Sequence, residues 1–415
     1  MTDPSPPPLV STFVGERYRE GSRTSDLISP PYDVISPQQR AVYQARNGHN
    51  IVRLVLPDGD DDRYERAAAT LSGWRAEGVL VRDDSPSAYV VRQEFDALDG
   101  RSYVRTGVIA AVAVEPYTSG RVRPHERTHR GPKEDRLALM RSTRAMFEAL
   151  LMMARDCDGA LQEQLGAVTT SDPDVRADLE GVAVSMWRVS GADGDSLTEA
   201  AGRDDALYIA DGHHRYETAG AYHSENPAAG STLALIVPLS DPGLVVLPTH
   251  RVVHGESIHE NALHEIADDL FDVSPLDSAN EAEDVLAAHR NESTTCVVCL
   301  PGLKTFSLRL KPDVNLTEVG LPDEITVRDL DIARIDRLVV DNLVGIAGEE
   351  ASRSYDASVG GVVNAVESGG AAAGVLVNPT GVEQVLAVAD AGAFMPQKST
   401  YFAPKVPSGL VILGW

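Results

Sequence analysis

One short stretch of the sequence gathers side chains that bind phosphate. In "YIADGHHRYETAG", a buried-strand pattern ends at Asp211-Gly212, and His213, His214 and Arg215 follow where a helical pattern begins. Glycine at such a turn lets a ligand approach the backbone closely, and the first amides of a helix attract an anion. Arg215 adds a planar fork that fits two phosphate oxygens. Asp211 can accept from a hydroxyl or hold a metal-bound water, so the stretch predicts a phosphate-binding turn.

The competing interpretation of this stretch is structural. Asp211 would then cap the helix, and the histidines would satisfy nearby backbone groups. The concentration of five such residues in one turn favours the functional interpretation. A zinc site is not favoured, because adjacent histidines rarely bind one metal and the sequence has no HExxH pattern.

A second stretch, "RVRPHERTHRGPKEDR" from Arg121 to Arg136, crowds arginines, two histidines and Lys133 into an otherwise acidic protein. It predicts an electropositive pocket for phosphate or carboxylate. Glu126 lies inside it and stays ionised among cations, so it can deprotonate a hydroxyl, which is typically worth ~10²–10⁴-fold in rate. The alternative is a surface loop of ion pairs.

Two further segments carry candidate residues. In "PPYDVIS", prolines hold Tyr32-Asp33 on a rigid turn, and the structural alternative is that Asp33 caps a helix starting near Pro37. In the tail "MPQKSTYFAPK", Lys398 and Lys405 are predicted to close over a bound anion.

Composition limits the classes of function. The net charge is 37 − 62 = −25, which argues against binding the phosphate backbone of DNA or RNA. No apolar run approaches the ~18 residues of a membrane span. The polar, proline-rich start "MTDPSPPPLV" does not have the order of a signal peptide, so it predicts a disordered lead-in and a cytoplasmic protein. Cys296 and Cys299 form a CxxC, but the surrounding pattern predicts a core strand.

The order of expected elements predicts a mixed α/β protein with three sections. Residues 1–116 form an α+β section, 117–254 the middle section with both candidate stretches, and 255–415 a C-terminal α/β section. The patterns predict a strand over 50–56, a helix over 62–78, a hairpin of 88–95 with 103–115, and a long helix over 327–346.

The motifs "PPYDVIS", "RPHERT…GPKEDRLAL" and "ADGHHRYETA", with the tail "MPQKSTYFAPK", resemble a widespread family known only as a domain of unknown function. The resemblance spans nearly the whole chain. The family's middle portion is similar to free serine kinases of the ParB/sulfiredoxin-type fold, which phosphorylate L-serine using ADP or ATP with magnesium. The resemblance therefore implies a ParB/sulfiredoxin-like nucleotide-binding core at 117–254, flanked by the other two sections.

The resemblance also assigns roles to residues. It implies that the nucleotide's phosphates bind at the Asp-Gly-x-His-Arg motif and that Glu126 is the base on the serine hydroxyl. We further expect Asp211 to orient Mg²⁺, and cations of the second stretch and the tail, namely Arg123, His125, Lys133 and Lys398, to anchor the acceptor's carboxylate. The expected partners are a nucleotide and an amino acid, with neither nucleic acid nor membrane.

Two other functions stay open at this point. One is a nucleotide-binding regulatory switch with little turnover, as in the ParB relatives. The other is a small-molecule phosphatase or nucleotide hydrolase that uses the same turn. Reduction of a sulfinic acid is not expected, since His213 stands where sulfiredoxins carry their reactive cysteine.

Overall fold

The computed structural model describes residues 7–128 and 130–415. The predicted lead-in at 1–6 and His129 of the basic stretch lie outside the described residues. The chain forms two units, and each is built from separate stretches of sequence. Unit 1 contains the chain up to Pro124, Thr128–Val245 and Ala403–Trp415, and unit 2 contains His125–Arg127 and Val246–Phe402.

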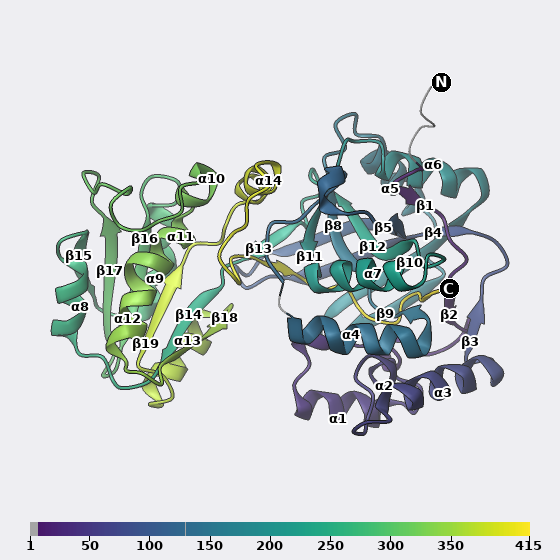
Figure 1. The fold of residues 1–415 in the computed structure, drawn as a ribbon, viewed down its shortest axis with the longest axis horizontal. Helices are drawn as coiled ribbons and strands as arrows, with labels where there is room; N and C mark the ends of the chain where they lie inside the picture. The colour runs from purple at the N-terminus through teal and green to yellow at the C-terminus, as the bar shows by residue number, and fades with distance from the viewer. Residues whose placement is uncertain (1–6, 129) are drawn as a thin grey trace. The chain divides into compact units, whose positions relative to one another are not determined.

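Unit 1 is organised around a mixed sheet. Its strands are β1 (Val10–Ser11), β4 (Ser87–Asp96), β5 (Ser102–Ala113), β6 (Val122–Arg123), β8 (Leu150–Ala154), β9 (Val175–Leu179), β10 (Val182–Ser190), β11 (Leu207–Asp211) and β12 (Ser231–Pro238). They run in the order β6-β11-β8-β12-β5-β4-β10-β9, and β1 pairs with β5 (Figure 1). The predicted hairpin is confirmed, with Asp96 opposite Ser102. Strands from the first two predicted sections share this sheet, so a boundary at 116 differs from the observed division.

The two faces of the sheet are covered differently. Val90 and Val108 point to the face where α5 (Ala160–Val168) and α6 (Gly191–Ala201) pack. Successive side chains alternate between the faces of a strand. Arg105 is three residues before Val108 on β5 and therefore points to the opposite face. There its guanidinium donates to the carbonyls of Ala403 and Pro404. The last segment of the chain thus lies against the second face.

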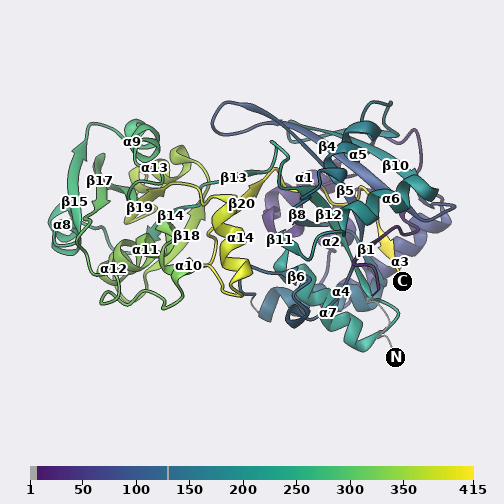
Figure 2. The ribbon, with the colours of Figure 1, turned by 90° about the horizontal axis from the view of Figure 1, so that it is seen from above.

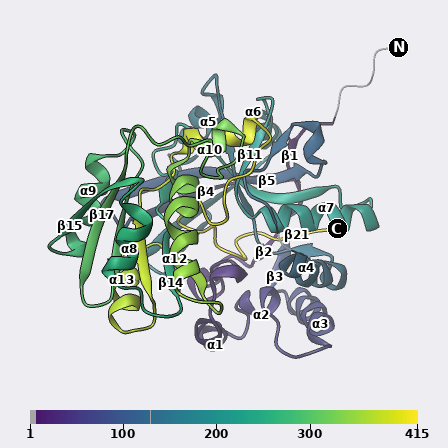
Figure 3. The ribbon, with the colours of Figure 1, turned by 60° about the vertical axis from the view of Figure 1, so that its left-hand side comes forward.

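A second hydrophobic core in unit 1 takes residues from α2 (Val52–Val55), α3 (Arg63–Ala76) and α4 (Arg130–Thr143) and from neighbouring strands and loops. The unit also contains α1 (Pro37–Arg46) and α7 (His213–Glu225), and Tyr216 of α7 belongs to the core against the sheet. Figure 3 shows α1 to α4 grouped together, and α4 packs against both α3 and α7. Short strands complete the unit: β2 (Glu16–Tyr18) pairs with β3 (Leu80–Arg82), and β21 (Leu413–Gly414) with β7 (Ala145–Met146). The short 3-10 helices are η1 (Thr24–Asp26), η2 (Tyr32–Val34) and η3 (Tyr117–Ser119).

The strand predicted over 50–56 is wrong, because this stretch contains α2. Ile51, Leu54 and Val55 all belong to the second core, so the segment is surrounded by apolar side chains and shows no helical period. Asn50 lies just before the helix, and its side-chain oxygen accepts from the amide of Val52, the first residue of α2. A short apolar run does not distinguish a strand from a buried helix.

Unit 2 is a sheet with helices on both faces. Its sheet contains β14 (His250–His254), β15 (Phe271–Leu276), β16 (Thr295–Leu300), β17 (Lys304–Leu310), β18 (Ser352–Asp356) and β19 (Ala373–Val377), in the order β15-β17-β16-β19-β14-β18. The short strands β13 (Val245–Leu247) and β20 (Tyr401–Ala403) pair with each other. The helices are α8 (Glu260–Ala267), η4 (Ala279–Glu281), α9 (Ala282–Ala288), α10 (Ile325–Arg328), α11 (Asp331–Ile335), η5 (Asp336–Val340), α12 (Asp341–Ile346), α13 (Val359–Glu367) and α14 (Val382–Asp390). Figure 2 shows α9 and α13 on one side of this sheet and α11 and α12 on the other.

The CxxC lies in the buried strand that the sequence predicts. Cys296 and Cys299 are both in β16, and burial raises the pKa of the Cys299 thiol to about 11. A thiol with a raised pKa is a poor nucleophile. Within residues 7–128 and 130–415, no helix has the length and apolar character needed to cross a membrane.

A buried ion pair joins the predicted long helix of unit 2 to its sheet. The helix is interrupted after α10, and its middle, η5, is a π-helical turn that begins at Asp336. Arg251 on β14 is fully buried and binds the Asp336 carboxylate through Nε at 2.7 Å and Nη2 at 3.1 Å. Removing one partner of such a pair leaves an unpaired buried charge.

Replacing Asp336 by alanine is expected to lower the free energy of unfolding by about 3–5 kcal/mol, because Arg251 then stays buried without a counter-charge. Urea denaturation followed by far-UV circular dichroism measures the change. The matched control is Asp341→Ala on the same helical run, which removes a half-buried carboxylate that pairs with Arg353 near the surface and should cost only about 0–1 kcal/mol. Equal losses in both variants would contradict the prediction.

Candidate functional site at the start of helix α7

The turn between β11 and α7 requires glycine. Gly212 has φ 97° and ψ 28°, in the left-handed region that other residues rarely adopt. A Cβ at this position would lie 2.7 Å from Cδ2 of Leu150 and 3.0 Å from Nε of Arg215. The predicted strand, turn and helix are confirmed. The side chains around the turn leave no room for a Cβ atom at residue 212. Gly212 also has no side chain with which to cap the first amides of α7.

The carboxylate of Asp211 is held between two cations. Lys405 donates from Nζ to Oδ1 at 2.6 Å, and Arg215 donates from Nη2 to Oδ2 at 2.7 Å. Burial by itself raises the pKa of a carboxyl group, but the charges of Lys405, Arg215 and His213 outweigh it and hold the pKa of Asp211 well below its usual range. Asp211 is thus ionised at neutral pH and fixes the last segment of the chain to the turn.

Arg215 points into unit 1 and is almost fully buried. Besides Asp211, its guanidinium donates from Nη1 to the carbonyl of Ala149 at 2.6 Å. The sequence predicts that this fork holds phosphate oxygens, whereas here two of its N–H groups already bind protein oxygens. Arg215 therefore orients Asp211 and the strand β8 that follows Ala149.

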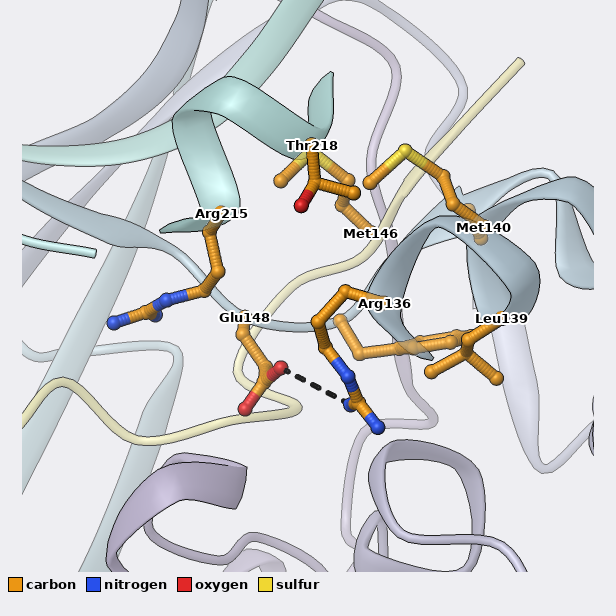
Figure 4. Close-up of a pocket in the computed structure, with 9 residues that line it drawn as sticks. Arg136, Leu139, Met140, Met146, Glu148, Arg215 and Thr218 are labelled. Carbon is orange, nitrogen blue, oxygen red and sulfur yellow. Dashed lines mark ion pairs between the residues drawn. The ribbon is translucent and has the colours of Figure 1, made fainter. Parts of the chain in front are cut away.

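A buried acid that sequence reasoning missed lies beside Arg215. Glu148 accepts from the backbone amide of Tyr32 at 2.8 Å and from the hydroxyl of Ser408 at 3.3 Å, and its Oε2 lies 3.9 Å from Nη1 of Arg136 (Figure 4). Burial raises the pKa of Glu148, although Arg215, Arg136 and the Tyr32 amide oppose that shift. The one sequence signal was an acid in the otherwise apolar run "AMFEALLMMA".

Glu148 connects the motifs that the sequence singled out. Tyr32 comes from "PPYDVIS", Arg136 from "GPKEDRLAL", Arg215 from "DGHHRYETA" and Ser408 from the tail. The guanidinium of Arg136 also lies over the Tyr32 ring, 4.2 Å from its centroid. The structural alternative in which Asp33 caps the helix near Pro37 is wrong, since Ser36 caps α1, which starts at Pro37.

The cavity beside Glu148 is small. Its lining includes Arg136, Glu148, Arg215 and Thr218 together with apolar side chains, and its volume is about 30 Å³ (Figure 4). That space admits one or two water molecules and is far too small for a nucleotide. A nucleotide at this turn would therefore have to lie outside this cavity.

A family match covers most of the chain. Residues 10–333 match the family described as "Protein of unknown function (DUF1015)". The chain belongs to this family. A search of curated proteins found no match.

Several solved structures are partly similar to this chain. One is a free serine kinase variant in complex with AMP, with 13% identity and a TM-score of 0.39. The match covers 72% of this chain and 92% of the kinase. A conserved hypothetical protein from Pyrococcus furiosus has 14% identity and a TM-score of 0.36, with coverages of 72% and 95%. SbnI from Staphylococcus aureus, truncated at its C-terminus, has 10% identity and a TM-score of 0.37, with coverages of 72% and 84%. TM-scores of this size do not establish a shared fold.

Two of the residues predicted to anchor the acceptor's carboxylate, Lys133 and Arg123, contact other protein groups in unit 1. Lys133 donates from Nζ to Glu217 at 2.6 Å, one turn into α7. Arg123 donates from Nε to the carbonyl of Gly120 and lies over the ring of Tyr208. Lys405 rather than Lys398 is the tail lysine that the structure brings to Asp211.

The remaining predicted residues differ in burial and in unit. In unit 1, His213 is buried and His214 is half-buried at the start of α7. In unit 2, His125 is buried, with Nε2 3.2 Å from the Thr400 hydroxyl, while Glu126 is half-buried and Lys398 is exposed. The roles assigned to Glu126, His125 and Lys398 stay predictions.

Replacing Gly212 by alanine is expected to lower the free energy of unfolding by about 2–4 kcal/mol, because it adds left-handed strain to a clash with Leu150. The control is Gly220→Ala on the same helix, where the new Cβ would meet only Val114 at 3.7 Å. That variant should gain up to about 1 kcal/mol from helix propensity. Thermal unfolding measures the difference in stability between the two variants. A Gly212→Ala protein as stable as the parent would contradict the prediction.

The stability difference between Glu148→Gln and the parent protein should depend on pH. Since the folded-state pKa of Glu148 is raised above its ordinary value of 4.5, the folded protein holds this proton more tightly than the unfolded chain does. The parent therefore loses stability relative to the glutamine variant as the pH rises through 4.5 toward the folded pKa. Urea titrations at pH 4 to pH 8 measure the difference, and a pH-independent difference would show that Glu148 is not the titrating group.

Proposed function

We propose that this protein is a phosphotransferase that moves a phosphoryl group from ATP or ADP to a small hydroxylated metabolite, most simply free L-serine. The observation that carries the proposal is the turn at Gly212, where a helix begins without a capping side chain next to Lys405 and two histidines. Such a helix start attracts phosphate oxygens. The proposal includes a ParB/sulfiredoxin-like nucleotide-binding core and a cytoplasmic location.

In the proposed reaction the acceptor hydroxyl attacks the terminal phosphorus of the donor. The hydroxyl oxygen forms the new bond to phosphorus, the hydroxyl proton passes to Glu126, and ADP or AMP leaves with the bridging oxygen. The start of α7 with His213 and His214 would hold the phosphates, and Lys405 would offset developing charge. His125 and Lys398 are assigned to the acceptor's carboxylate.

Chain connectivity supports the assignment of Glu126. Arg123 pairs with Tyr208 where β6 runs parallel to β11, and the Thr128 hydroxyl donates to Glu217 on α7 at 2.6 Å. Glu126 is two residues from Thr128, and two residues of chain span at most about 7 Å. The covalent chain therefore keeps Glu126 close to a residue that is bound to α7.

Asp211 does not fit the magnesium role that the sequence predicts for it. Each of its oxygens already accepts from a cation, so a metal ion there would face two positive charges at close range. Phosphoryl transfer still needs its charge offset, and Mg²⁺ bound to the nucleotide would supply that. Asp211 would instead keep Lys405 at the turn.

The test is to incubate the pure protein with Mg²⁺, radiolabelled ATP or ADP and a panel of amino acids that includes L-serine. Phosphoserine is the expected product, and Glu126→Gln should reduce its rate by about 10²–10⁴-fold because the general base is removed. Glu349→Gln is the matched control, since Glu349 is an exposed carboxylate of the same unit, and its rate should be unchanged.

Other outcomes would replace the proposal by one of the two alternatives. Tight nucleotide binding without a phosphorylated product would indicate a regulatory switch. Release of inorganic phosphate without transfer would indicate a hydrolase. A phosphoserine rate that Glu126→Gln leaves unchanged would remove Glu126 from the mechanism.

A further inference from the structure

Unit 1 has a second and much larger cavity between β2, β3, the end of α4 and the last residues of the chain. Its volume is about 430 Å³, and its lining includes Glu16, Arg75, Leu80, Arg82, Arg144 and Trp415. We call it the arginine cavity. Its volume lies in the range of small-molecule sites, and its lining shares no residue with the Asp211 turn or with the cavity beside Glu148.

The arginine cavity has an excess of positive charge. Arg75 is neutralised by Glu16, which it binds through Nε at 2.7 Å and Nη2 at 2.9 Å. Within the described part of the chain, neither Arg82 nor Arg144 forms an ion pair or a side-chain hydrogen bond. Arg82 and Arg144 are exposed to solvent, and their two guanidinium groups line one cavity without a protein counter-charge in a protein whose net charge is −25.

The backbone conformation at residue 144 favours glycine, so the presence of arginine there needs a reason. Arg144 directly follows α4 with a φ of 50°, which is the position and conformation where glycine is usually found. An arginine there is less favourable for the backbone than glycine. Its carbonyl accepts from the amide of Trp415 at 3.1 Å, but any residue would provide that bond, so the side chain itself needs another explanation.

Trp415 adds a donor and an apolar wall. Its indole Nε1 is buried and has no acceptor among the described residues, and a buried donor without an acceptor is costly. The indole ring packs against Tyr222 with 5.3 Å between centroids, and the buried Leu80 lines the same space. An oxygen-rich group with an apolar body would complement these residues.

We propose that the arginine cavity binds a small organic dianion, either a phosphate monoester or a dicarboxylate. Its anionic group lies between Arg82 and Arg144, whose planar forks bind phosphate and carboxylate oxygens in pairs. Its apolar part lies against Leu80 and Trp415. This site is separate from the phosphoryl-transfer site proposed above and does not require that reaction.

Calorimetric titration with two probes tests the proposal and distinguishes the two anions. Phenyl phosphate and phthalate carry the same ring and differ in the anionic group, and at least one should bind saturably at constant ionic strength. Arg82→Ala and Arg144→Gly should each raise its Kd about tenfold or more, as expected for loss of a charge-assisted hydrogen bond. Arg101→Ala, which changes an exposed arginine in the β4–β5 turn outside the cavity, should leave the Kd unchanged.

Arg144→Gly also separates binding from folding. Glycine suits the backbone of residue 144, so the Tm of this variant should not fall even though the probe binds more weakly. The proposal is overturned if neither probe binds the parent protein. It is equally overturned if both arginine variants keep the parent Kd, or if Arg101→Ala weakens binding as much as they do.

Discussion

The charge pairing at Asp211 is the interaction on which unit 1 depends most. A carboxylate buried at the end of a strand is costly unless cations compensate it, and here the two cations come from α7 and from the last segment of the chain. Arg215 in turn binds the carbonyl before β8. One ionised group therefore fixes the strand end, the helix start and the C-terminal segment together.

Glu148 extends the same principle to the other motifs. It lies beside Arg136 and Arg215 and accepts from Tyr32 and Ser408. Motif residues that suggested direct substrate contacts are thus in large part the supports of the turn. In the function proposed above, the phosphates are assigned to the backbone at Gly212, the histidines that follow it and Lys405, while Glu126, His125 and Lys398 are assigned to the acceptor.

The sequence predicted local structure well where one signal dominated. The turn at Gly212 followed from a buried-strand pattern, a glycine and a helical pattern, and the 88–115 hairpin followed from its turn residues. The strand expected at 50–56 failed because a fully buried segment has no period. The family resemblance drew on the same motifs, and the match over residues 10–333 is in accord with it.

The direction of side chains was beyond sequence reasoning. Whether Arg215 faces a ligand or the protein depends on what is buried around it, and the Ala149 carbonyl lies 66 residues away in the chain. Glu148 was missed for the same reason, since a single acid in an apolar run gives no sign of partners at Tyr32 and Ser408. The two units divide the chain differently from the three predicted sections, because β4 pairs with β10 and β5 pairs with β12 across the expected boundary at residue 116.

Unit 1 is built from three separate stretches of sequence, and the last of them follows residues 246–402 of unit 2. This order affects when unit 1 can be completed during synthesis on the ribosome. Lys405 and Ser408 emerge only after residues 246–402, which all belong to unit 2. At 5–20 residues per second, that interval lasts roughly 8–30 s. During it, the nascent protein holds the carboxylates of Asp211 and Glu148 without their C-terminal partners, so unit 2 has time to fold before unit 1 is complete.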